Sequence, residues 1–203
     1  MADIFVTEAN DNGSGNIPNT LSWAILQANT MGGDDRIILQ TDVTVTGVMR
    51  RLLNSNITIT GDNTATAAVE NYSISGGGNF RPLFVRSGNI TLENLQLTNG
   101  LAQGGSSGVG GGGAGMGGAL FVYEGTVSAG NVTFSGNQAI GGNGNQGGLG
   151  YGGGGMFGSS PLGAGGGGGL FGNSAGNNGG YGGFGAYGGG GGGGFGTGGV
   201  GTG

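Results

Sequence analysis

The residues of this chain that could do chemistry are few, and most of them are carboxylates. Ten Asp and Glu side chains are accompanied by five Arg side chains, and the chain has no His, no Cys and no Lys. Their absence removes the imidazole base, the thiolate, the lysine Schiff base and the usual zinc site. It also removes any disulfide framework. A catalytic or metal-binding function would therefore have to rest on carboxylates.

Cleavage of polysaccharides is the first reaction that carboxylates could catalyse. Glycoside hydrolases place two of them across a substrate groove. Late in the chain the candidates are Glu93 and Glu124, and in the internal repeat described below Glu93 aligns with Gly130 and Glu124 with Ser87. No two carboxylates share a row of that repeat. We therefore predict no catalytic residues, no cofactor-binding residues and no enzymatic activity.

Metal binding is the second chemistry to weigh. Asp34, Asp35 and Asp42 lie close together in the sequence, and Ca²⁺ takes several oxygen ligands. The segment Asp11-Asn-Gly-Ser-Gly15 has the start of a calcium loop but not the later acidic ligand of an EF-hand. We interpret both as solvated turns and predict no metal site.

Charge and hydropathy limit the partners and the location. The net charge is −5 and there is no basic run, which argues against nucleic acid and anionic membranes as partners. No apolar run is long enough to span a bilayer as a helix. The N-terminus shows no basic region followed by an apolar region, so no cleavable signal peptide is expected.

Composition divides the chain. Glycine supplies 60 residues, 11 of them within residues 1–100 and 49 within 101–203, and no charged residue follows Glu124. Such a shift marks a boundary between two kinds of segment. We predict a cap at 1–34, repeated coils at 35–145 with a Gly-rich loop at 101–117, and an uncharged Gly-rich segment at 146–203. For the last segment, disorder, degenerate coils and packed polyglycine helices all remain open.

Short strands and one helix are expected to position these residues. Five short segments have strand signals: 3–8, 36–40, 43–47, 57–61 and 72–76. In 57–61 and 72–76 β-branched or aromatic residues alternate with hydroxyls, which is the period of a strand. The helical candidate is 21–29, in which Leu21, Ala24, Ile25 and Ala28 form one apolar stripe. Thr20 is its expected N-cap. We predict that this helix caps the open end of the strand stack; packing on the side of the stack is the alternative.

An internal repeat indicates the architecture. Residues 83–99 match residues 120–136 at a constant offset of 37, with Leu-Phe-Val, one Gly and one Asn identical. Repeats built from short strands and Gly corners are typical of a parallel β-solenoid. We predict that Leu95, Leu97, Val132 and Phe134 point inward.

The repeated asparagines suggest a ladder. Asn94 stacked under Asn131 would form a buried amide ladder at a bend, with ordinary turn residues as the alternative. Three Asn-x-Thr sequons, at Asn56, Asn89 and Asn131, are interpreted as coincidental in a β-rich chain.

The cap and coil motifs also resemble a known family. Asp11-Asn-Gly-Ser-Gly15, Leu21, Ala24-Ile25, Ala28-Asn29 and Gly33-Asp34 are similar to the N-terminal cap of bacterial pectin-lyase-like β-helix surface proteins, although Ser22 stands where that family has Arg. The segments 117–120 and 134–137 resemble the coil repeats of polymorphic outer-membrane proteins. The resemblance covers about Asp3 to Asn145. It implies a right-handed parallel β-helix and an exported surface protein.

Three functions remain for comparison. A non-enzymatic secreted or cell-surface solenoid in adhesion or matrix, with surface polysaccharide as a possible partner, agrees with the scattered carboxylates. A carbohydrate-active enzyme or carbohydrate-binding module of the pectin-lyase-like fold is the alternative. A Gly-rich structural or ice-binding protein would need an unbroken Thr row on one face, and the sequence predicts that this row is broken.

Overall fold

The computed structural model describes residues 1–61, 70–108, 111–144 and Ser159. It divides the chain into two compact units. The first comprises Met1–Leu101 and Gly117–Gln138, and the second comprises Ala102–Met116 and the chain from Ala139. The Gly-rich segment 146–203, apart from Ser159, lies outside the described residues, so its predicted character stays a prediction.

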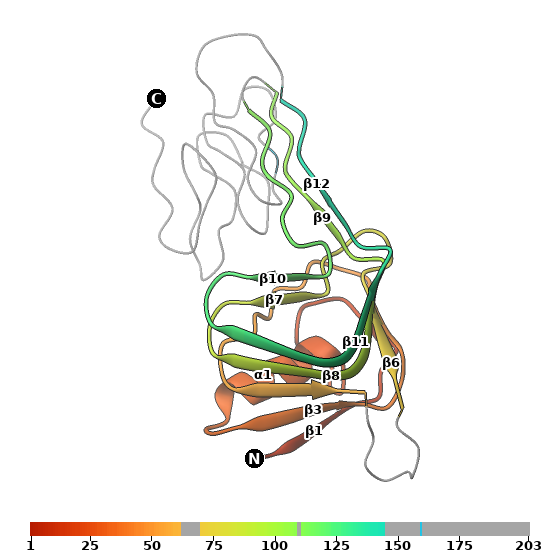
Figure 1. Ribbon diagram of the computed structural model, residues 1–203, viewed down its shortest axis with the longest axis vertical. Coiled ribbons are helices and arrows are strands. Elements are labelled where there is room, and N and C mark those ends of the chain that lie inside the picture. The colour runs from red at the N-terminus through yellow and green to blue at the C-terminus, as the bar shows by residue number, and fades with distance from the viewer. Residues whose placement is uncertain (62–69, 109–110, 145–158, 160–203) are drawn as a thin grey trace. The chain divides into compact units, whose positions relative to one another are not determined.

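The first unit is a parallel β-solenoid, as the repeat predicts (Figure 1). Its first wall stacks five strand segments in parallel, each from a successive coil. From the N-terminal end they are β1 (Asp3–Val6), β3 (Asp35–Leu39), β5 (Ile57–Thr60) and the first halves of β8 (Asn89–Thr98) and β11 (Thr126–Ser135).

A second wall continues each coil around a corner. It stacks β2 (Asn10–Asp11), β4 (Val43–Val45), β6 (Tyr72–Ser75) and the second halves of β8 and β11. A third wall pairs β7 (Leu83–Val85) with β10 (Leu120–Val122), and Leu53 bridges to Val85 below them. Leu-Phe-Val therefore stacks on Leu-Phe-Val, because the offset of 37 is the length of one coil.

The core is made by rows of like residues from successive coils. On the first wall Ile4, Ile37, Ile59 and Leu92 are in register and all are buried. Parallel strands lie about 4.8 Å apart, so each side chain contacts the one above it. In the last described coil, Ala129 is in register with Leu92 and continues this row.

The helix α1 (Leu21–Thr30) begins as expected. The side chain of Thr20 accepts a hydrogen bond from the Trp23 N–H, and the predicted apolar stripe is buried. At the other end, the Asn29 side chain donates to the Leu52 carbonyl at 2.7 Å and accepts from the Asn54 N–H at 3.1 Å. The helix therefore lies beneath Leu52 and Leu53 as the first layer of the third wall. Its buried face joins the same core cluster as Ile4, Ile37 and Leu53, so the helix covers the N-terminal end of the core, as the capping prediction expects. The outer edge of β1 takes no strand among the described residues.

Two details of the coil differ from the sequence-based expectation. The Asn94–Asn131 ladder exists, but it lies at the surface rather than buried. Phe134 stacks on the fully buried Leu97, yet its own side chain is 51% exposed, because it belongs to the last coil that the structure describes.

The second unit is held by glycine backbone. Near its start lie β9 (Leu101–Gln103) and β12 (Gln138–Ile140), which pair with each other. Three segments that continue from these strands, 102–107, 111–116 and 139–143, exchange hydrogen bonds in a cycle. Gly104 donates to Ile140, Gly142 to Gly113, and Gly113 to Gly105, each at 2.8 Å. A Cβ atom added at Gly104 or Gly142 would overlap backbone of a neighbouring segment, so glycine is required there.

Candidate functional site

The two candidate acids lie on different walls of the solenoid. Glu93 ends the first half of β8, where its register neighbours are Thr60 and Gly130. Glu124 follows β10 on the third wall, and both side chains are exposed. The structure therefore does not stack another carboxylate on either one. A pair across a groove, the arrangement that glycoside hydrolysis needs, is not formed by Glu93 and Glu124.

The three early aspartates bind to three different parts of the chain. Asp34 accepts from the Asn56 side chain at 3.1 Å, and Asp35, which is buried, accepts from the Ala2 N–H at 2.9 Å. Asp42 accepts from both the N–H and the hydroxyl of Ser73. Among the described residues no group of three potential metal ligands occurs.

Asp11 anchors the helix from a fully buried position. Its carboxylate accepts hydrogen bonds from the Ser22 N–H, the Ser22 hydroxyl and the Gly13 N–H. Ser22 Oγ in turn accepts from the Gly15 N–H at 2.9 Å. The segment 11–15 is therefore not the solvated turn expected from the sequence, because its acid holds the first turn of α1. Ser22, at the position where the resembling family has Arg, completes this network.

Arg81 is the cation most involved in packing. Its Nε donates to the Gly117 carbonyl at 2.8 Å, and its guanidinium lies 5.6 Å from the Phe84 ring centroid and 5.5 Å from that of Phe121. Burial lowers the pKa of Arg81 to about 10, so the side chain remains a cation at neutral pH. Its contacts tie the third wall to the point where the chain returns to the stack at Gly117.

A row of hydroxyls runs up the outside of the second wall. Thr44, Ser75, Thr98 and Ser135 are in register from coil to coil, and all are at least partly exposed. The Thr row is broken as predicted, since Ser takes alternate positions, but the register makes the row of hydroxyls continuous. The strand spacing puts successive hydroxyls about 4.8 Å apart.

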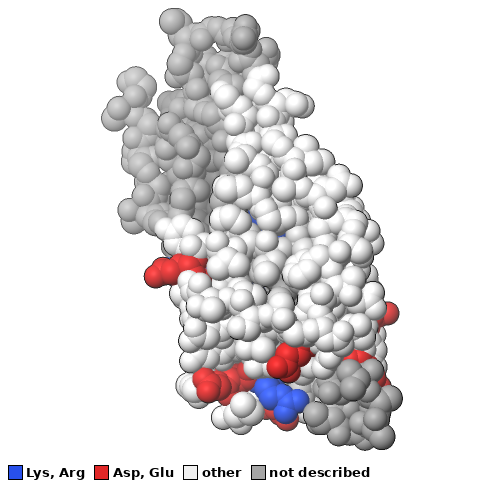
Figure 2. Space-filling model, in the orientation of Figure 1, with Lys and Arg blue, Asp and Glu red and all other residues white. Residues whose placement is uncertain are grey.

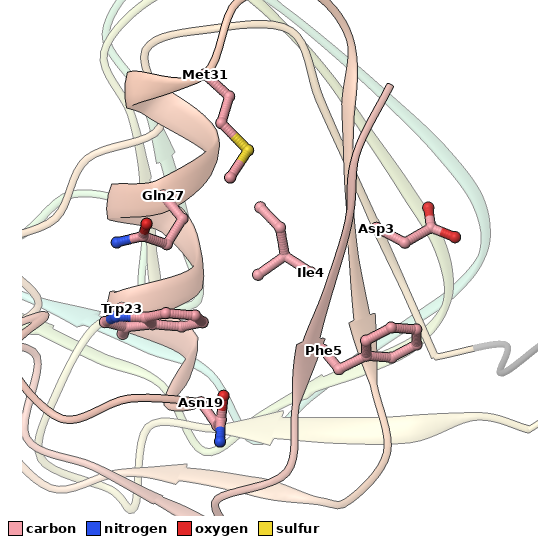
Figure 3. Close-up of a pocket in the computed structure, with 7 residues that line it drawn as sticks. All are labelled: Asp3, Ile4, Phe5, Asn19, Trp23, Gln27 and Met31. Carbon is pink, nitrogen blue, oxygen red and sulfur yellow. The ribbon is translucent and has the colours of Figure 1, made fainter.

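A shallow pocket of about 270 Å³ lies between α1 and β1 (Figure 3). Met31, which follows the helix, and Ile4 of β1 point toward each other, while Trp23 and Gln27 line the pocket from the helix. Asp3 and Phe5 also line the pocket, but their side chains lie on the far side of β1. Asp3 and Phe5 therefore line the pocket with their backbone atoms. The sequence analysis missed this pocket; the i, i+4, i+8 spacing of Trp23, Gln27 and Met31 was the available signal.

The visible surface carries few charges. Figure 2 shows one face on which most of the described surface is uncharged and the charged side chains gather mainly at the lower end, over the first strands. Asp3 and Arg36 belong to those strands and form a partly exposed ion pair at 3.8 Å. In the described ranges there is no helix of the length and apolarity that a bilayer crossing requires.

Comparisons of the chain with protein-family models, with curated proteins and with solved structures find no match.

Proposed function

We propose that the chain is a non-enzymatic, secreted or cell-surface β-helix protein that serves as an adhesive or matrix scaffold. The observation that carries this proposal is the in-register stack, in which each coil is bonded to the next along the first two walls and the third wall joins the later coils. Such an array is stiff, because every coil packs only on its neighbours and shares a continuous core with them. A stiff stack is better suited to presenting surface residues to a partner than to closing over a substrate in an active site.

The Gly-rich segment 102–116 supports the same proposal. It leaves the coil after β9, pairs with 139–143 through backbone hydrogen bonds, and returns at Gly117. Between Gly100 and Gly117 no charged residue occurs. An uncharged, backbone-rich element of this kind suits weak, multivalent contact with a polysaccharide.

The finer family assignment is also part of the proposal. Within the motifs that resemble polymorphic outer-membrane-protein repeats, Asn137 has a definite role. Its side chain donates to the Leu97 carbonyl at 2.8 Å and accepts from the Gly100 N–H at 2.7 Å, joining two coils. An Asn that bonds successive coils is a reason for such a motif to repeat, which favours membership of the pectin-lyase-like surface proteins.

The test compares binding with turnover on pectin, alginate and related glycans. The full chain should bind at least one glycan in a surface-immobilised assay and release no reducing ends or unsaturated products. Glu93→Gln and Glu124→Gln should leave the binding unchanged, with Glu8→Gln as the matched control. Turnover that either substitution abolishes would establish the alternative, a carbohydrate-active enzyme.

A second candidate, ice binding, is favoured by one observation, the continuous hydroxyl row of the second wall. A regular array of hydroxyls spaced by the strand repeat presents ordered hydrogen-bonding groups to water. Thermal hysteresis of the full chain that is lost in Thr98→Lys and kept in Thr126→Lys, at an exposed position of the first wall, would support it. Absence of hysteresis in the unsubstituted chain would reject it.

A further inference from the structure

Among the residues that the structure describes, no strand pairs with the outer edge of β1, so this edge carries unused backbone groups. In a parallel ladder, alternate residues of a strand bond to the same neighbour. The carbonyls of Ala2 and Val6 accept hydrogen bonds from the β3 segment, at 2.8 and 2.9 Å. The N–H and C=O groups of Asp3 and Phe5 must therefore point to the opposite side, away from β3.

This open edge has a defined length. Immediately after β1, the Asn19 carbonyl accepts from the N–H groups of Thr7 and Glu8, at 3.1 and 3.3 Å. Asn19 therefore occupies the edge beyond Val6. The open stretch is the three residues Asp3, Ile4 and Phe5, with two backbone donors and two backbone acceptors spaced two residues apart, the repeat of a β-strand.

The pocket lies directly beside this edge. Ile4 projects into it, opposite Trp23 and Met31 (Figure 3). Met31 is 41% exposed and Phe5 43%, so apolar surface flanks the open backbone on both faces of the strand. An edge without Lys, Pro or a bulge is a template for another strand.

We propose that the β1 edges of two copies of this chain pair antiparallel about a two-fold axis at Ile4. In an antiparallel pair, residues opposite each other alternate between bonded and non-bonded pairs. Asp3 of one copy and Phe5 of the other would exchange both N–H···O bonds, twice over by symmetry. Ile4 would lie opposite Ile4 in the non-bonded pair, where side chains are closest.

A second copy fits because the edge is complementary to itself. Reversing Asp-Ile-Phe places each carboxylate opposite a phenyl ring, so no two like charges are opposed. Both Ile4 side chains lie on the pocket side, where one fills the space beside the Trp23 and Met31 of the other copy. A two-fold pair also closes on itself, so it uses the exposed edge without forming a fibre.

The first test is the solution mass of the full chain by light scattering after gel filtration. We expect twice the mass of the chain at micromolar concentration. Phe5→Pro removes an N–H that points away from β3, so it should halve the mass while the circular dichroism stays unchanged. Met31→Lys should also halve it, because it places a charge at the pocket rim without touching the ladder.

Val122→Lys is the matched control, since Val122 is exposed to a similar degree, 40%, at the other end of the stack. It should leave the doubled mass unchanged. A monomeric unsubstituted chain, or doubled mass retained in Met31→Lys, would overturn the proposal.

The second test fixes the register. The chain has no Cys, so Asp3→Cys and Phe5→Cys each introduce a single thiol. Bonded antiparallel pairs have Cα atoms about 5.5 Å apart, within the range of a disulfide. Mixed under oxidation, the two variants should cross-link rapidly, and neither should do so alone. Equal cross-linking by Asp3→Cys alone would reject this pairing.

Discussion

The side-chain amide of Asn131 donates to Asn94 Oδ1 at 2.8 Å, 37 residues earlier in the chain, and both backbones have φ of 52°. Each asparagine turns its coil from the first wall to the second. A positive φ is a conformation that Asn and Gly tolerate and other residues adopt at a cost. In the coil below, Gly61 is in register with Asn94 for a different reason, since its φ is not positive but a Cβ there would overlap the Asn94 carbonyl oxygen.

Substitutions at Asn94 separate the backbone from the amide bond. Asn94→Gly keeps the positive φ and loses the hydrogen bond, so we expect a loss of about 1 kcal/mol in the free energy of unfolding. Asn94→Ala also forces a Cβ into the left-handed region and should cost about 1–2 kcal/mol more. Urea unfolding measures both, with Thr133→Ala as control. Equal losses for Gly and Ala would show that φ is not the constraint.

Asp11 should be the most sensitive carboxylate of the chain. Asp11→Ala leaves the Ser22 N–H, the Ser22 hydroxyl and the Gly13 N–H without their acceptor in a buried site. A buried donor left unsatisfied costs about 1–3 kcal/mol, so the thermal unfolding midpoint should fall clearly. Asn12→Ala, which removes one exposed hydrogen bond to Ser14, is the control and should change little.

Leu97 and Phe134 occupy the same inward row, but we expect unequal effects on truncation. Leu97 is fully buried, so Leu97→Ala should cost about 2–5 kcal/mol in the free energy of unfolding. Phe134→Ala should cost clearly less, because half of its surface is already exposed. Chemical denaturation of the two variants is the measurement. A Phe134 loss as large as that of Leu97 would mean that this ring is buried in solution.

Arg81 should resist replacement by lysine. The guanidinium donates through Nε to Gly117 and lies near two rings, whereas an ammonium cannot donate from the same place and stack as a plane. We expect Arg81→Lys to lower the free energy of unfolding by about 1 kcal/mol, the net contribution of a typical intramolecular hydrogen bond. Arg50→Lys, at an exposed position, should be neutral. A neutral Arg81→Lys would show that only the charge matters.

The sequence by itself determined the solenoid and the register between the two coils that carry the 37-residue repeat. Like residues of successive coils must stack at a fixed spacing, so the repeat of 37 residues predicted that Leu83-Phe-Val would lie under Leu120-Phe-Val and Asn94 under Asn131. The helix and its Thr20 cap also followed from local pattern, because an apolar stripe and a capping hydroxyl act within a few residues. These features depend on the periodicity of apolar and repeated residues, which can be read from a single sequence.

Only the tertiary structure decided where the polar groups find partners. The sequence indicates a turn residue at Asp11. Folding instead brings its carboxylate to Ser22, where it is buried and accepts hydrogen bonds from the first turn of α1. The hydroxyl row emerges only when coils of unequal length, one offset by 31 residues and the next by 23, align Thr44, Ser75 and Thr98. Hydrogen-bond partners and exposure depend on which distant segments meet in space, and local pattern does not encode that.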